Sequence, residues 1–492
     1  MSILRKLSKK NLKFELLFPL VIFFIAFGLR IYTLNENLFF GWEQGRDALI
    51  VQEVLSGQKL TLIGPKTDIE GIFHGAFYYY LLAIPYLLGK GNPLIAAYFW
   101  AFIHALGAVV IFFIAKNEFK LITRVGVSLI YAFSFQGIVF SKWLSNPSLC
   151  LPLTVFLLYA LKEKFNKNNF LLALIFWGLI FHLELIAALF LFPVLVYYSL
   201  RNLKNFKPII IVQGIFLLSI IFSPYFIFDI RHNHLLFNGF LNLLGGTKET
   251  QLNVWHFLKD QMIVFQREFS LSIIPKFPFL VKFIFLAGII CLFWDRKKYL
   301  SKLIFLGLIS PFLLTIVVKT IPMSQALIAS LPFFYLFCAI IIEKIVDFKK
   351  FYFLGSGLIL FIVFSNFLYY QETIPQNKNL FFHAYQYTFL GDQKRILDFI
   401  YKEADGQNFS FNYYSFPYWL PQGWNYLFSW YGKEKYGYLP QEQRTETFFV
   451  IIEPDEVDKK RQDLWYENFN KESKVLETFT SRNLKVEKRT IL

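Results

Sequence analysis

Long apolar runs recur along the whole chain and constrain its fold more than any other feature. A helix needs roughly 20 residues to cross a hydrocarbon core of about 30 Å, and many runs approach or exceed that length. They are residues 16–34, 93–115, 121–140, 149–161, 208–227, 277–293, 303–318, 324–342 and 351–370. Composition agrees, since 56% of the residues are hydrophobic and 62 of 492 are Phe, more than a soluble core uses. We predict a polytopic α-helical membrane protein.

The apolar run 170–199 is ambiguous, and the basic residues resolve it, because short cytoplasmic loops collect Lys and Arg. Basic clusters precede the first run and follow several others: Lys6, Lys9, Lys10 and Lys13; Lys116, Lys120 and Arg124; Lys162, Lys164 and Lys167; Arg201, Lys204 and Lys207; Arg296, Lys297 and Lys298; Lys344, Lys349 and Lys350. If Lys167 and Arg201 are both cytoplasmic, the chain between them crosses twice. The outer tip of this hairpin then lies near His182 and Glu184. The prediction is about eleven transmembrane helices, with the N-terminus inside and the C-terminus outside.

The net charge of +16 does not indicate nucleic-acid binding, because the excess of Lys and Arg sits in the loops predicted to be cytoplasmic. The three cysteines, Cys150, Cys291 and Cys338, lie in apolar runs without metal-binding or redox spacing. We expect buried thiols and no disulfide.

Three polar segments are predicted to lie outside the membrane. Residues 1–371 form a transmembrane domain whose outer loops are 35–92 and 229–276, and residues 372–492 form what we call the tail domain. The first loop should contain a helix from Asp47 to Leu55 and an amphipathic helix from Phe73 to Leu88 along the interface. In the tail, helical patterns at 394–403, 424–437 and 460–470 alternate with strand patterns at 408–414, 446–453 and 484–491. This alternation predicts a small α/β domain, with the aromatic run 426–432 packed on the transmembrane part.

Ionisable residues gather directly after the first apolar run. Glu43, Arg46 and Asp47 lie in Phe40-Gly-Trp-Glu-Gln-Gly-Arg-Asp47, and a second polar and aromatic cluster, Glu70 to Tyr80, includes His74 and Tyr78. Ionisable groups at a membrane surface call for a functional reason. We predict that the two clusters form one site on one face of the membrane.

These segments resemble one known family. Its pattern is carried by Trp42-Glu-Gln-Gly-Arg-Asp-Ala48, His74-Gly75 before Tyr78-Tyr79-Tyr80, Trp143 with Asn146-Pro147, and Pro224-Tyr225 with Asp229-Ile-Arg-His232. Their order resembles the C-type polytopic glycosyltransferases, in particular the protein O-mannosyltransferases and the bacterial lipid A aminoarabinose transferases. The resemblance implies transfer of a sugar from a polyprenyl-phosphate donor to an acceptor hydroxyl outside the membrane, with inversion. The acceptor would be a glycan, a lipid or a protein, and the location the plasma (inner) membrane of a bacterium.

The resemblance also implies a catalytic carboxylate in the first outer loop. The family places an aspartate there, often followed by a second acid, whereas this chain has Glu43 followed by Gln44. The base is therefore either Glu43 or Asp47, one helical turn on. The structural alternatives are an interfacial Glu43 paired with Arg46, and an Asp47 that caps a helix or forms a salt bridge.

Other residues are candidates for contacts with the donor or acceptor: Arg46, His74, Tyr78, His182, Glu184, Arg231, His232, Arg267 and Lys319. Each has a structural alternative. His74 could bond a loop carbonyl, Tyr78 could belong to an interfacial aromatic belt, and His182 and Glu184 could pair with each other. Arg231 and His232 could extend from a helix end to the interface. Asn146 is expected to cap a helix.

Metal dependence stays open at this point. Glu43, Asp47, His74, His182 and Glu184 could supply ligands to a divalent ion if the fold gathers them, but no closely spaced motif requires one. We predict no metal site. Two other classes compete with the transferase: a flippase or exporter would carry its charges within the spans, and a lipid-linked glycan polymerase would have arginine-rich outer loops.

Overall fold

The structure is a computed structural model of the 492-residue chain. It describes residues 2–67, 69–114, 116, 118–161, 164–245, 254–318, 324–348, 352–373, 388–415, 420–455 and 457–492. Side chains are described within these ranges except for residues 2–16, 243–245, 254, 256, 315, 317 and 318.

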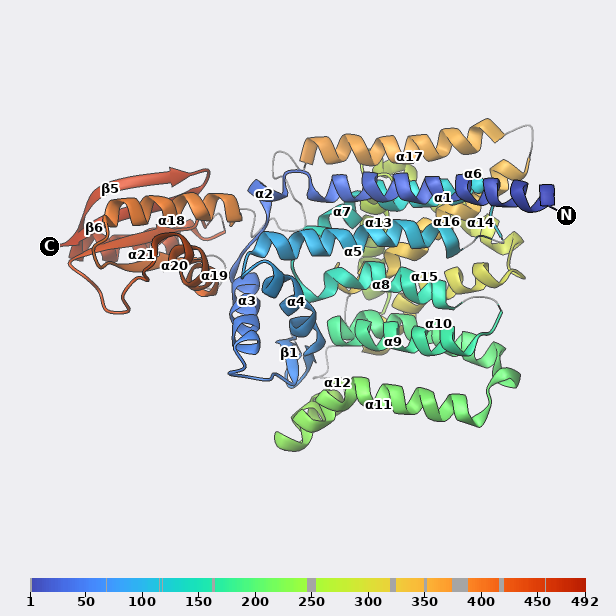
Figure 1. The fold of residues 1–492 in the computed structure, drawn as a ribbon, viewed down its shortest axis with the longest axis horizontal. Coiled ribbons are helices and arrows are strands. Elements are labelled where there is room, and N and C mark those ends of the chain that lie inside the picture. The colour runs from blue at the N-terminus through green and yellow to red at the C-terminus, as the bar shows by residue number, and fades with distance from the viewer. Residues whose placement is uncertain are drawn as a thin grey trace.

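A bundle of apolar helices is formed by the chain up to Thr373 of its 492 residues (Figure 1). Its long helices run side by side, with the N-terminus at one end and the tail domain at the other. The elements are α1 (Ser2–Ile31), α5 (Pro93–Ile114), α6 (Leu121–Phe133), α7 (Phe135–Ser141), η1 (Asn146–Leu149), α8 (Cys150–Ala160), α9 (Lys167–Leu183), α10 (Leu185–Arg201), η2 (Leu203–Asn205), α11 (Pro208–Arg231), α12 (Leu235–Gly245), α13 (Val254–Ile273), η3 (Pro278–Leu280), α14 (Val281–Trp294), α15 (Tyr299–Val318), η4 (Ala326–Ser330), α16 (Leu331–Asp347) and α17 (Tyr352–Thr373).

The chain is an integral, multi-pass membrane protein, as predicted. Among the described residues, 4 helices are long and apolar enough to cross a membrane, or up to 6 if each of two bent pairs is one span. Shorter apolar helices, including α8, α9 and α10, complete the bundle. The predicted hairpin tip is confirmed, because α9 ends at Leu183 and α10 begins at Leu185. The total of about eleven crossings stays a prediction.

The predicted span 121–140 is broken at Ser134, where α6 and α7 meet at 53°. Side chains from two other helices satisfy the backbone groups that the break releases. The buried Arg30 guanidinium of α1 donates to the carbonyls of Ala132 (3.1 Å) and Tyr131 (3.4 Å). Asn366 of α17 accepts the N–H of Phe135 at 2.8 Å. Inside a membrane protein an irregular backbone is tolerated only where such partners are available.

The first loop folds as short elements at the end of the bundle nearest the tail domain (Figure 1). They are α2 (Leu34–Asn37), α3 (Trp42–Leu55), β1 (Ile63–Lys66), β2 (Phe73–Gly75) and α4 (Phe77–Leu88). The helix expected from Asp47 begins earlier, at Trp42, because Gln44 accepts the N–H of Gly41 at 3.1 Å and closes the first turn. The stretch 73–88 is not one helix, since Phe73 and Lys66 pair in an antiparallel hairpin before α4 begins.

The tail domain is a small mixed sheet with helices, as predicted. Its elements are α18 (Leu390–Ala404), β3 (Ser410–Tyr414), α19 (Gln422–Leu427), the π-helical turn η7 (Phe428–Gly432), α20 (Lys433–Tyr436), β4 (Thr447–Ile452), α21 (Lys459–Glu472), β5 (Ser473–Ser481) and β6 (Leu484–Ile491). The strand order is β3-β4-β6-β5, with β3 and β4 parallel and the other pairs antiparallel. The sequence did not predict β5, which is a largely exposed edge strand without a regular apolar alternation.

Candidate functional site

An ion pair within α3 forms the centre of the candidate site. The Arg46 guanidinium lies 2.8 Å from Asp47 Oδ1 through Nη2, and its Nε donates to the same oxygen at 2.9 Å. The Asp47 side chain is 3% exposed and that of Arg46 is 26% exposed. The guanidinium also lies over the Trp42 ring, 5.2 Å from its centroid. The contacts with Asp47 and Trp42 therefore fix the orientation of the Arg46 guanidinium, and part of the side chain stays exposed.

Two tyrosines of α4 enclose Asp47. The Tyr79 hydroxyl donates to Asp47 Oδ1 at 3.4 Å, and Tyr78 is fully buried between Tyr79 and Trp100. Burial raises the pKa of Asp47, while Arg46 and the tyrosine hydroxyls act in the opposite direction. Tyr78 and Tyr79 thus do not belong to an aromatic belt, whereas Tyr80 is 37% exposed.

Glu43 lies one turn before Asp47, on the same side of α3. Its side chain is partly exposed, in contrast to the enclosed Asp47. Its charge also acts on Arg46 and favours the charged guanidinium. The closest pairing of Arg46 is nevertheless with Asp47. Of the two carboxylates, Glu43 is the more exposed.

The second sequence cluster meets the first through β2. His74 is partly exposed, but its Nδ1 is enclosed, and desolvation of the ring together with the positive charge of Arg46 lowers its pKa to about 4. His74 is therefore neutral at pH 7. The next residue, Gly75, touches the His182 ring so closely that a Cβ on Gly75 would lie 1.9 Å from His182 Nδ1. The hairpin tip between α9 and α10 is thereby brought beside the first loop.

The hairpin tip is held by contacts that the sequence did not predict. His182 Nε2 bonds the Ile221 carbonyl at 2.8 Å, and its ring lies 5.0 Å from that of Tyr225 in α11. Glu184 is 8% exposed. The expected cap at Asn146 is wrong, because Ser145 holds the N-cap position and Asn146 Nδ2 donates to the Leu183 carbonyl at 2.5 Å.

The remaining described candidates lie on α11 and α13, and α11 contacts β2, where the rings of Phe73 and Phe228 lie 5.7 Å apart. Arg231 and His232 end α11 and are exposed, and His232 bonds the Phe228 carbonyl at 2.8 Å while its ring stacks on Phe228. Arg267 of α13 pairs with Glu268 at 3.1 Å and donates to Ser324 at 2.6 Å. Lys319 lies outside the described residues.

The sequence analysis missed a buried carboxylate, Glu268. It is fully buried and accepts hydrogen bonds from Gln136 (2.7 Å), Ser324 (2.7 Å) and Arg267. A signal was available, since Glu268 follows an arginine in a largely apolar stretch, and buried acids in membrane bundles need partners. No group of three potential metal ligands occurs within the part of the chain that the structure describes.

No protein-family model and no curated protein matches the chain. Solved structures do match it. The structure of ArnT from Cupriavidus metallidurans in the apo state aligns with a TM-score of 0.59 at 10% identity and covers 98% of each chain. The chain has the fold of ArnT. ArnT bound to undecaprenyl phosphate gives a TM-score of 0.56 at 10% identity over the same shares of the chains.

A second protein shares the ArnT-like architecture in part. The archaeal oligosaccharyltransferase AglB from Archaeoglobus fulgidus, in complex with an inhibitory peptide and a dolichol-phosphate, aligns with a TM-score of 0.50 at 12% identity. The match covers 83% of this chain and 63% of AglB. Together with ArnT, it confirms the predicted resemblance to the C-type polytopic glycosyltransferases at the level of the fold.

Proposed function

We propose that the protein is a glycosyltransferase that moves a sugar from a polyprenyl-phosphate donor to an acceptor hydroxyl outside the membrane, with inversion. The observation that carries this proposal is the match to ArnT over nearly the whole chain, tail domain included. The ArnT crystal structure is bound to undecaprenyl phosphate, and the AglB structure is a complex with an inhibitory peptide and a dolichol-phosphate. A lipid-linked donor needs a site where polar groups meet the bundle, and the cluster around Arg46 supplies such groups.

Glu43 is the proposed base. The acceptor oxygen attacks the anomeric carbon of the donor as Glu43 takes the hydroxyl proton. The bond from the anomeric carbon to the phosphate oxygen breaks, and its electron pair leaves with the polyprenyl phosphate. Attack from the side opposite the leaving group inverts the anomeric centre. A positioned general base contributes roughly 10²–10⁴ in rate.

Arg46 is the proposed partner of the leaving phosphate, and Asp47 holds it in place. Its guanidinium keeps an open face while Asp47 and Trp42 fix its direction. Charge-assisted hydrogen bonds to phosphate are strong in a site that excludes water. We retain His74, Tyr78, His182 and Glu184 as wall residues of the substrate site, and Arg231, His232, Arg267 and Lys319 as contacts to the donor or acceptor.

The proposed topology has about eleven crossings, counting α6 with α7 as one span and α14 as another, with residues 229–276 as an outer loop. The N-terminus is cytoplasmic, and the tail domain, residues 372–492, is extracytoplasmic. Basic residues at the end of the bundle remote from the tail domain support this orientation. The membrane is the plasma (inner) membrane, and the acceptor is a glycan, a lipid or a protein.

Transfer assays test the function and the base together. Membranes containing wild type, Glu43→Gln or Asp47→Asn are incubated with a panel of radiolabelled polyprenyl-phosphate sugars and cell-envelope acceptors. We expect Glu43→Gln to lose transfer by roughly 10²-fold or more while donor binding persists. Asp47→Asn, which should loosen Arg46, is expected to weaken donor binding more than the chemical step.

Two results would count against these assignments. Unchanged transfer by Glu43→Gln would exclude Glu43 as the base. The absence of transfer from any donor by folded wild type would argue against a transferase and in favour of a lipid-linked glycan exporter or polymerase.

A further inference from the structure

Backbone hydrogen bonds connect the tail domain to the segment of the first loop that directly precedes α3. The Phe40 N–H donates to the Thr388 carbonyl and the Leu390 N–H donates to the Leu38 carbonyl, both at 2.9 Å. Gln393 Nε2 adds a bond to the Phe40 carbonyl at 3.0 Å. Backbone pairing of this kind fixes a register and a direction. The segment that leads into α3 therefore takes its position from the tail domain.

Helix α3 itself meets α19 of the tail domain through two glycines. A Cβ on Gly45 would lie 2.4 Å from the Cα and N atoms of Gly423. A Cβ on Gly423 would lie 3.2 Å from the Gly41 carbonyl oxygen. The two backbones are therefore in direct contact, which only residues without a side chain permit. Gly45 is the residue immediately before Arg46.

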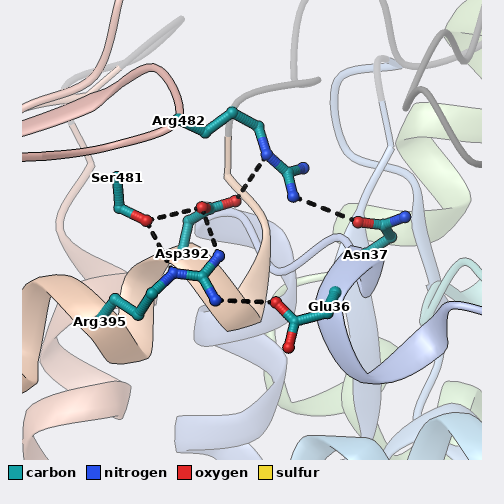
Figure 2. A network of polar contacts seen from close by, with 6 residues as sticks. All are labelled: Glu36, Asn37, Asp392, Arg395, Ser481 and Arg482. Atoms are coloured by element: carbon teal, nitrogen blue, oxygen red, sulfur yellow. Dashed lines mark hydrogen bonds and ion pairs between the residues drawn. The ribbon is translucent and has the colours of Figure 1, made fainter.

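A network of polar and ionic side chains also connects the tail domain to the first loop, at α2 (Figure 2). Arg395 of the tail domain pairs with Glu36 of α2 at 2.8 Å and with Asp392 at 2.8 Å. Arg482 pairs with Asp392 at 3.3 Å and donates to Asn37 at 3.4 Å. Asp392 is 1% exposed and also accepts from Ser481 at 2.8 Å. Networks with a buried member hold geometry better than isolated surface pairs.

The tail domain also places a carboxylate near the N-terminus of α3. Glu453, which is 5% exposed, accepts a hydrogen bond from Trp424 Nε1 at 2.9 Å. Glu453 and Trp424 line one small cavity together with Gly41 and Trp42, the cap and first residue of α3. Negative charge at a helix N-terminus is favourable.

We propose that the tail domain is a positioning element of the catalytic site, and that Gly423 and Arg395 are its positioning residues. They touch no substrate. They act through α3. Its cap Gly41 and its residues Trp42 and Gly45 contact the tail domain, whereas Glu43, Arg46 and Asp47 face the site. A displacement of a catalytic group by about 1 Å can cost on the order of 10²-fold in rate. The catalytic part of this inference rests on the proposed function.

The test uses full-length protein in lipid nanodiscs. Arg395→Gln breaks the pairs with Glu36 and Asp392, and Gly423→Val separates α3 from α19. Arg444→Gln is the matched control, because Arg444 pairs with Glu472 at 2.9 Å inside the tail domain and away from the contacts with the first loop. Hydrogen exchange of the α3 amides is measured first, because it does not depend on any substrate. The kcat and the KM for the donor follow.

We expect Arg395→Gln and Gly423→Val to speed exchange in α3 by about tenfold and to lower kcat by about tenfold, with the donor KM nearly unchanged. Arg395→Lys should restore part of both effects, and Arg444→Gln should alter neither. Unchanged α3 exchange would overturn the proposal, as would faster exchange with wild-type kcat. If Gly423→Val fails to fold, the Arg395 variants decide the outcome. If wild type transfers no sugar, the proposed function fails while the exchange data still test the coupling of the tail domain to α3.

Discussion

Glu43 and Asp47 lie one helical turn apart, yet their surroundings give them different tasks. Asp47 is enclosed by Arg46, Tyr78 and Tyr79, and its Oδ1 accepts hydrogen bonds from Arg46 and Tyr79. Glu43 is partly exposed. Two carboxylates in different environments commonly divide the roles of base and of electrostatic support. The division proposed here gives the proton transfer to Glu43 and the orientation of Arg46 to Asp47.

His74 should make the stability of the protein depend on pH. Its pKa is about 4 in the folded chain, compared with about 6.5 in an unfolded one. At pH values between these two pKa values, His74 binds fewer protons in the folded state than in the unfolded state. The free energy of unfolding therefore decreases as the pH falls from about 6.5 to about 4. Between pH 7 and pH 5 this loss amounts to about 2 kcal/mol.

The measurement is unfolding by SDS at pH 7 and at pH 5, for wild type and His74→Asn. The asparagine variant should lose about 2 kcal/mol less than wild type over this interval. Other titrating groups are common to both proteins and cancel in the difference. Equal losses in the two proteins would mean that the folded protein does not hold His74 in its neutral form.

At the level of elements, β2 packs closely against the hairpin tip between α9 and α10. Gly75 leaves no room for a side chain, since its Cβ would overlap the His182 ring. Asn146 and Ile221 add hydrogen bonds on either side of the tip. This contact joins the first loop, which carries the catalytic candidates, to the centre of the bundle.

Gly75→Ala should therefore destabilise the protein by about 1–3 kcal/mol, the usual cost of overpacking a closed site. Gly28→Ala in α1 is the control, because a Cβ there meets nothing within 4 Å. The readout is the same SDS titration. The double variant Gly75→Ala with His182→Ala should recover at least part of the loss, because the alanine at 182 frees the space. Strict additivity of the two changes would refute the contact.

At the level of the whole molecule, the proposed orientation in the membrane rests on the placement of charge. The basic loops lie at the end of the bundle where the N-terminus is drawn, and the tail domain lies at the other end (Figure 1). The native thiols of Cys150, Cys291 and Cys338 are all buried. Cysteines introduced at exposed positions can therefore be labelled without interference.

A membrane-impermeant maleimide should label Lys460→Cys in intact cells, since Lys460 is exposed on α21 of the tail domain. Lys297→Cys, which is exposed between α14 and α15, should be labelled only after the cells are permeabilised. The reverse pattern would invert the topology and move the proposed site to the cytoplasm. Wild type, treated in the same way, should stay unlabelled.

Hydropathy and the placement of Lys and Arg were enough to predict the membrane class, the hairpin tip near His182 and the α/β character of the tail domain. These are properties of one segment at a time, because each span must hide its own backbone from lipid. The part of α3 from Asp47 to Leu55 and three of the four tail strands followed from local patterns for the same reason, whereas the start of α3 at Trp42 did not.

The hydrogen-bond and ion-pair partners of the polar side chains, in contrast, depend on segments that are distant in the chain. The sequence could not tell whether Arg46 pairs with Glu43 or Asp47, since burial by Tyr79 of another helix distinguishes the two acids. Nor could it show that α6 breaks at Ser134, because Arg30 and Asn366 supply the hydrogen bonds. The contact between Gly45 and Gly423 joins residues far apart in the chain. Burial and close approach arise only when the elements pack, so the tertiary structure alone decides which polar residue of this chain is enclosed and which stays partly exposed.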